Sequence, residues 1–132
     1  MNVEFLDLEE QENPMNGERL ASASHLVELL DELRSSRQPF MCQLIADNGS
    51  MLTVGSASDG GCVQHSPSDG GSPYFMAVGS SEANMGEVEF AVGGTATPID
   101  RRYCLPFKQV KNICSYFLQT GDRSPSVTWE EI

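Results

Sequence analysis

Hydrophobic residues recur at helical spacing in two segments of the chain. In the first segment they occupy positions i, i+3, i+4 and i+7, namely Leu26, Leu29, Leu30 and Leu33. In the second they are Val110, Ile113, Cys114, Phe117 and Leu118. This spacing places the hydrophobic residues on one side of a helix. Ser22 or Ser24 is an N-cap candidate and Pro39 ends the first helix, whereas Thr120–Gly121 is a C-cap signal for the second.

Outside these helices the hydrophobic residues form short runs of strand length, separated by turn residues. Asp47-Asn48-Gly49 is a tight-turn sequence and predicts a hairpin. Glu87 to Val92 alternates acidic and apolar residues, as expected for a strand with one solvated face. Gly93 to Asp100, which includes Pro98, is predicted to be a loop. The predicted strands are 40–46, 51–55, 62–65, 74–78, 87–92 and 127–129.

The order of these elements is helix, several short strands, helix and strand. It predicts the α+β class, with an antiparallel sheet of about five to six strands and two main helices packed on one face. We expect residues 22–132 to form a single domain, since 132 residues can bury a core without metal or disulfide staples. Residues 1–21 are expected to be an acidic N-terminal arm in which Val3, Phe5 and Leu6 could form a short strand.

The charge of the chain is strongly acidic. Eight Lys and Arg residues against nineteen Asp and Glu residues give a formal net charge of −11. No Lys or Arg occurs from Met41 to Asp100, a stretch that carries Asp47, Asp59, Asp69, Glu82, Glu87, Glu89 and Asp100. Such a field repels nucleic acid and anionic membranes and speeds encounter with a basic protein. Acidity that serves solubility alone is the alternative interpretation.

The N-terminus has neither the basic region nor the apolar run of a signal peptide. No segment approaches the ~20 apolar residues that a membrane-spanning helix needs. We therefore expect a cytoplasmic protein.

Residues with catalytic chemistry are sparse. Cys42, Cys62, Cys104 and Cys114 lie in apolar runs without C-x-x-C spacing, so we expect reduced core residues. Cys62 and His65 are three positions apart in a predicted strand and would point to opposite faces, which argues against a Cys–His nucleophile. The glycine pairs lack the lysine that follows a phosphate-binding loop. We therefore expect a protein that is not an enzyme and holds no cofactor or metal.

Several short sequence segments occur together in a familiar order. They are residues 42–49, 52–55, 61–65, 73–77, 93–103, 116–123 and 127–132. This combination resembles the small immunity proteins that are encoded beside deaminase toxins in bacterial polymorphic-toxin systems. The resemblance covers roughly residues 22–132 and depends on the order of the segments, because no single one is chemically diagnostic.

The resemblance implies that the chain binds a cognate deaminase toxin and blocks its active site. Such a toxin uses a zinc-activated water and a basic nucleic-acid channel, so an acidic partner is suited to cover it. From the residues we expect charge complementarity from Asp59, Asp69, Glu87 and Glu89, and packing or hydrogen bonding from Tyr74 and His65. The alternative is an acidic cytosolic adaptor or small-ligand-binding module unrelated to toxins.

Overall fold

The computed structural model describes residues 2–8, 12–36, 40–57, 60–67, 72–79, 87–92 and 95–132. Two α-helices, a short 3-10 helix and nine strands occur in this part of the chain. In chain order they are β1 (Val3–Asp7), β2 (Arg19–Leu20), α1 (Ala23–Ser36), β3 (Phe40–Ala46), β4 (Met51–Ala57), β5 (Gly60–Ser66), β6 (Phe75–Val78), β7 (Glu87–Val92), β8 (Thr95–Asp100), η1 (Arg101–Tyr103), α2 (Phe107–Thr120) and β9 (Thr128–Glu131).

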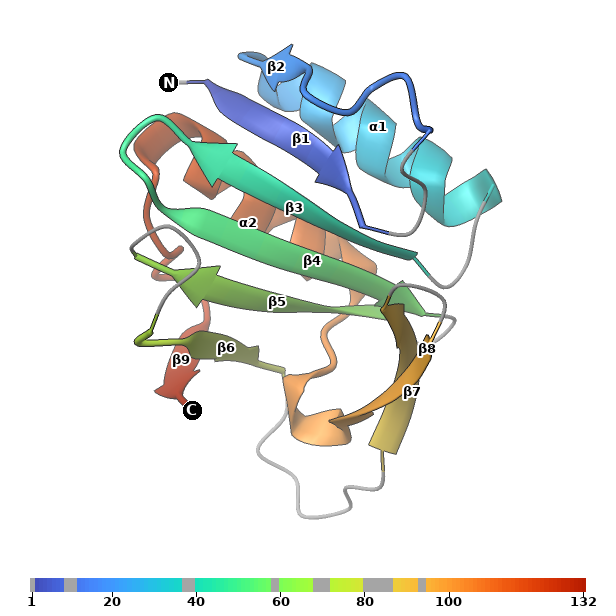
Figure 1. The fold of residues 1–132 in the computed structure, drawn as a ribbon. Helices are drawn as coiled ribbons and strands as arrows, with labels where there is room; N and C mark the ends of the chain where they lie inside the picture. Colours follow the sequence, from blue (N-terminus) through green and yellow to red (C-terminus); the bar gives the residue numbers. More distant parts are fainter. Residues whose placement is uncertain are drawn as a thin grey trace.

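Seven strands form one sheet in the order β2-β1-β3-β4-β5-β6-β9, and every neighbouring pair is antiparallel. Both α-helices lie behind this sheet in Figure 1, and the β7–β8 hairpin lies in front of it. The predicted α+β class with helices on one face is therefore confirmed, with slightly more strands than expected. Within the described ranges, no helix is long and apolar enough to span a membrane.

The core lies between the sheet and the two helices. Leu26, Leu29, Leu30 and Leu33 of α1 are buried, as are Val110, Ile113, Cys114, Phe117 and Leu118 of α2, so both predicted helical stripes are confirmed. The C-cap prediction is also confirmed, because Gly121 has a positive φ of 72° and its N–H donates to the Phe117 carbonyl. The Asp47-Asn48-Gly49 turn joins β3 and β4 as the predicted hairpin.

Residues 95–100 correct the sequence interpretation, because they form strand β8 and not a loop. Thr95, Thr97 and Ile99 are β-branched residues at alternate positions, which favours a strand. Pro98 favours a loop, but each strand of a two-stranded sheet has an unpaired side where a missing N–H costs no ladder bond. The predicted strand 87–92 is present and pairs with β8, outside the seven-stranded sheet.

The N-terminal residues complete the sheet instead of forming a loose arm. The short strand expected there is β1, which pairs with β3 on one side and with β2 on the other. Val3 and Phe5 are fully buried because they lie on the helix-covered face. The segment between β1 and β2 is held by backbone bonds, from the Phe5 N–H to the Glu18 carbonyl and from the Gly17 N–H to the Phe5 carbonyl.

Candidate partner-binding surface

The β7–β8 hairpin brings three acidic residues to one face of a two-stranded ribbon. Its register pairs Glu87 with Asp100 and Glu89 with Pro98. Because residues alternate between the faces of a strand, Glu87, Glu89 and Asp100 share one face. The other face carries Val88, Phe90 and Val92 of β7 and their partners in β8.

Asp100 is not among the site residues expected from the sequence, because residues 93–100 were interpreted as a loop. Alternation of β-branched residues over 95–99 was the available signal. Acidic residues directly opposite each other destabilise an antiparallel pair by roughly 0.2–1 kcal/mol.

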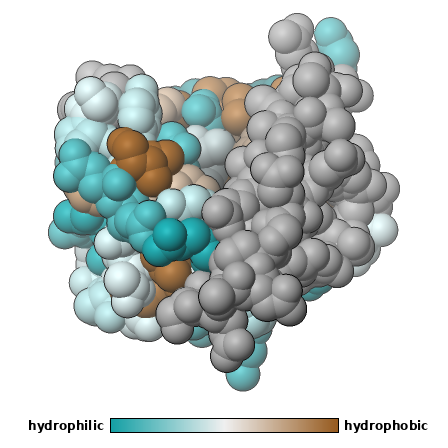
Figure 2. Space-filling view, turned by 90° about the horizontal axis from the view of Figure 1, so that it is seen from below, coloured by the Kyte–Doolittle hydropathy of each residue, from teal (hydrophilic) through white to brown (hydrophobic). Residues whose placement is uncertain are grey.

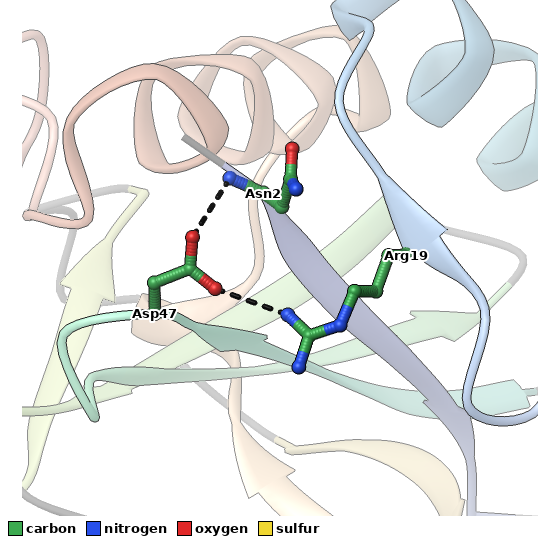
Figure 3. A network of polar contacts seen from close by, with 3 residues as sticks. All are labelled: Asn2, Arg19 and Asp47. Atoms are coloured by element: carbon green, nitrogen blue, oxygen red, sulfur yellow. Dashed lines mark hydrogen bonds and ion pairs between the residues drawn. The ribbon is translucent and has the colours of Figure 1, made fainter.

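Asp47, the first acidic residue of the base-free stretch, has partners in the folded protein. Its carboxylate accepts hydrogen bonds from the Arg19 guanidinium at 3.0 Å and from the Asn2 backbone N–H at 3.3 Å, as Figure 3 shows. Arg19 lies on β2, so the N-terminal strands supply a base that the stretch itself lacks. The charge of Asp47 is thus partly neutralised, and the acidic hairpin becomes the stronger candidate for a basic partner.

His65 lies on β5 in the interior of the sheet and is only 2% exposed. Its ring centroid lies 6.0 Å from that of Phe117 and 6.2 Å from that of Trp129, both edge-on. Burial lowers the pKa of His65 below its usual value, and the nearby Arg123 lowers it further, while Asp122 acts in the opposite direction. His65 is therefore a buried residue that packs between Phe117 and Trp129, and it has no direct access to a partner.

Tyr74 is half-buried and directly precedes β6. Its carbonyl accepts a hydrogen bond from the Ile132 N–H at 2.9 Å, which ties the C-terminus to this edge of the sheet. Asp59 and Asp69 lie outside the described residues. Glu87 and Glu89 therefore lie on the same strand, β7. His65 lies on β5 and Tyr74 directly precedes β6, and these two strands are neighbours in the seven-stranded sheet.

The cysteines are mainly core residues. Cys42, Cys62 and Cys114 are buried, and burial raises the pKa of both Cys62 and Cys114 to about 12. A thiol with such a pKa carries almost no thiolate near neutral pH, so it is a poor nucleophile. Within the described part of the chain, no three His, Cys, Asp or Glu side chains are grouped to hold a metal ion.

The described surface is mostly polar. Figure 2 shows one face on which hydrophilic residues predominate and hydrophobic residues occupy small separate areas. Among the described residues Ile132 is the large hydrophobic side chain that is strongly exposed, at 59%.

The antiparallel sheet with one helix-covered face and the separate hairpin define a small acidic α+β protein. The family of the immunity protein Imm1 matches residues 16–131 of the chain. The chain therefore belongs to the Imm1 immunity protein family, and this membership supports a toxin immunity role with a cognate toxin as partner. A comparison with curated proteins found no match.

Proposed function

We propose that this immunity protein binds a cognate bacterial deaminase toxin and inhibits it by covering the active site and the basic nucleic-acid channel. Membership of the Imm1 family supports a toxin as the partner. The β7–β8 register carries the assignment of the surface, because it places Glu87, Glu89 and Asp100 on one face. Inhibition by occlusion requires no catalytic group.

The choice of a deaminase follows from charge and from the sequence resemblance. Deaminases that act on nucleic acids draw a polyanion into a positively charged channel beside the zinc-activated water. A protein with a net charge of −11 competes for the same surface by charge complementarity. The sequence segments that resemble immunity proteins of deaminase toxins support the same target.

Each expected site residue has a proposed role, although Asp59 and Asp69 lie outside the described residues. Glu87, Glu89, Asp59 and Asp69 would meet basic groups of the toxin. Tyr74 would pack against it from the edge of the sheet. His65 is buried, so it would act through packing of Trp129 and not by contact.

Co-expression with the toxin encoded beside its gene tests this proposal. We expect bacteria to survive, a stable complex to appear on size exclusion, and deamination of a cytosine-containing DNA to stop at a one-to-one ratio. A catalytically inactive toxin variant separates binding from toxicity. Death of the cells despite soluble expression, or a neighbouring toxin without deaminase activity, would refute the proposal.

A further inference from the structure

A short backbone contact joins β5 to the connection between η1 and α2. Gly61 of β5 and Leu105 of the connection form an isolated antiparallel bridge. The Gly61 N–H donates to the Leu105 carbonyl at 2.9 Å, and the Leu105 N–H donates to the Gly61 carbonyl at 2.7 Å. In an antiparallel ladder, a pair that exchanges both bonds is followed by a pair without them, whose Cα atoms lie about 4.5 Å apart. This register places Cys62 opposite Cys104.

The packing around the bridge puts both cysteine side chains on the same side of the sheet. Leu105 is buried in the core that the helices cover. Because neighbouring residues of a strand alternate between its faces, Cys104 points to the other side. There Cys62 forms a second buried cluster with Met41 and Met76, and Cys104 packs against this cluster.

Two glycines let the Cys104 residue approach the sheet closely. A Cβ atom at Gly60, which shares a face of β5 with Cys62, would lie 3.6 Å from the Cys104 Sγ atom. A Cβ atom at Gly79, directly after β6, would lie 2.0 Å from the Cys104 carbonyl oxygen. Burial raises the pKa of the Cys62 thiol to about 12, and the Cys104 thiol contributes in the same direction. The two thiols are therefore neighbours in the folded protein.

Opposed positions of this kind suit a disulfide bond, because the Cα atoms of two bonded cysteines lie about 4.4–6.8 Å apart. In this structure both residues are thiols. They differ in access to solvent, since Cys62 is buried and Cys104 is only partly buried. Cys42 and Cys114 are fully buried in the helix-covered core, which shields them from a reagent in solution.

We propose that Cys62 and Cys104 form a reversible disulfide bond when the protein meets a low-molecular-weight disulfide such as oxidised glutathione. The Cys104 thiolate attacks one sulfur of the reagent, forms a mixed disulfide and releases one glutathione thiolate. The Cys62 sulfur then attacks the Cys104 sulfur and releases the second glutathione. The two cysteines lose two electrons and two protons, and the reagent takes them up as two molecules of reduced glutathione.

The order of the two steps follows from access and from thiolate content. Cys104 reacts first because it is partly exposed, whereas the raised pKa of Cys62 leaves little thiolate near neutral pH. The second step takes place within one molecule, so the proximity of the two sulfurs offsets the low thiolate content of Cys62.

The bond would fasten the end of the β7–β8 hairpin to the seven-stranded sheet. Strand β8 ends at Asp100 and is followed by η1, so Cys104 lies shortly after the hairpin. A covalent link from Cys104 to β5 would reinforce the two backbone bonds of the bridge. It also closes a long loop and restricts the unfolded chain, which stabilises the folded protein.

Incubation of the native wild-type protein with oxidised glutathione tests the proposal. Mass spectrometry should show that the intact chain loses two hydrogen atoms and regains them with dithiothreitol. Digestion with trypsin and Asp-N together puts each cysteine on its own peptide, and the linked peptides should be 59–68 and 103–108. The same treatment in urea should give mixed pairs. A native protein that stays unlinked, or that links another pair, would overturn the proposal.

Single variants separate the two roles. Cys104→Ser should form no disulfide, whereas Cys62→Ala should retain one glutathione on Cys104. The matched control is Cys114→Ala, which removes a buried thiol from α2 and should still form the disulfide. A glutathione that remains on Cys104 of the wild-type protein would show that Cys62 does not reach it, and would overturn the proposal.

Thermal unfolding measures the effect of the bond on the fold. Oxidised wild-type protein should unfold at a temperature about 5 °C or more above that of the reduced protein. Cys104→Ser should unfold at the same temperature with and without the reagent. Equal unfolding temperatures of the oxidised and reduced wild type would overturn the inference that the bond fastens the hairpin to the sheet.

Discussion

His65 is a polar residue in an apolar environment. Within the described structure neither ring nitrogen has a hydrogen-bond partner, and the nearest rings are those of Phe117 and Trp129. A buried polar group without a partner costs about 1–3 kcal/mol. From the sequence, His65 is expected to pack against or hydrogen-bond to a partner, as a residue of the base-free stretch. Its burial could not be read from β5 alone, since the rings around it, Phe117 of α2 and Trp129 of β9, come from segments far away in the sequence.

Stability should fall as the pH drops below the ordinary pKa of histidine. The folded-state pKa of His65 is lowered, so the unfolded chain binds a proton more readily than the folded protein. The stabilisation is therefore present above about pH 6.5 and is lost as the pH falls from there towards the folded-state pKa. Urea unfolding at pH 8, 6.5 and 5 measures this loss.

The control for this prediction is His65→Phe, which keeps an aromatic ring between Phe117 and Trp129 but cannot be protonated. Carboxylates titrate in both proteins, so the difference between them isolates His65. We expect the variant to retain more of its stability at pH 5 than the wild type. If the free energy of unfolding falls equally with pH in the two proteins, the prediction is contradicted.

At the scale of elements, local patterns predicted some structures and missed others. Helix α2 was predictable because five hydrophobic residues and a C-capping glycine agree with one another. Strand β8 was missed because Pro98 outweighed the β-branched residues around it. Strand β2 has only two residues and exists through its pairing with β1, which no local pattern reveals.

Gly60, at the start of β5, should be intolerant of any side chain. Its φ is +135°, and a Cβ atom there would lie 2.1 Å from the carbonyl oxygen of Leu105. Leu105 belongs to the connection from η1 to α2. Its N–H donates to the Gly61 carbonyl, and its carbonyl accepts from the Gly61 N–H. We expect Gly60→Ala to lower the free energy of unfolding by at least about 2 kcal/mol, measured by urea denaturation.

Gly17→Ala separates steric conflict from backbone strain. Gly17 also has a positive φ, of +85°, but a Cβ atom there would meet no described atom within 4 Å. This variant should cost only about 1–2 kcal/mol for the left-handed conformation. If the two variants are equally destabilised, the contact with Leu105 is not what excludes a side chain at Gly60.

At the scale of the whole molecule, the net charge of −11 follows directly from the sequence, whereas the positions of the charges depend on the fold. Three of the bases that the structure describes form ion pairs: Arg19 with Asp47, Lys111 with Asp31, and Arg102 with Glu130. The register of the β7–β8 hairpin adds three acidic residues at neighbouring positions, Glu87, Glu89 and Asp100. This distribution predicts that long-range attraction guides the approach of a basic toxin.

Association with the toxin should therefore be fast at low salt and slow steeply as salt increases, since the screening length falls to about 10 Å at 0.1 M. Glu87→Lys/Glu89→Lys should reduce the association rate about tenfold at low salt and flatten its salt dependence. Asp122→Lys/Glu131→Lys makes the same change in net charge near β9 and should have a much smaller effect. Stopped-flow kinetics across salt concentrations distinguish the two. Equal slowing by both variants would mean that net charge, and not the acidic face of the hairpin, guides the encounter.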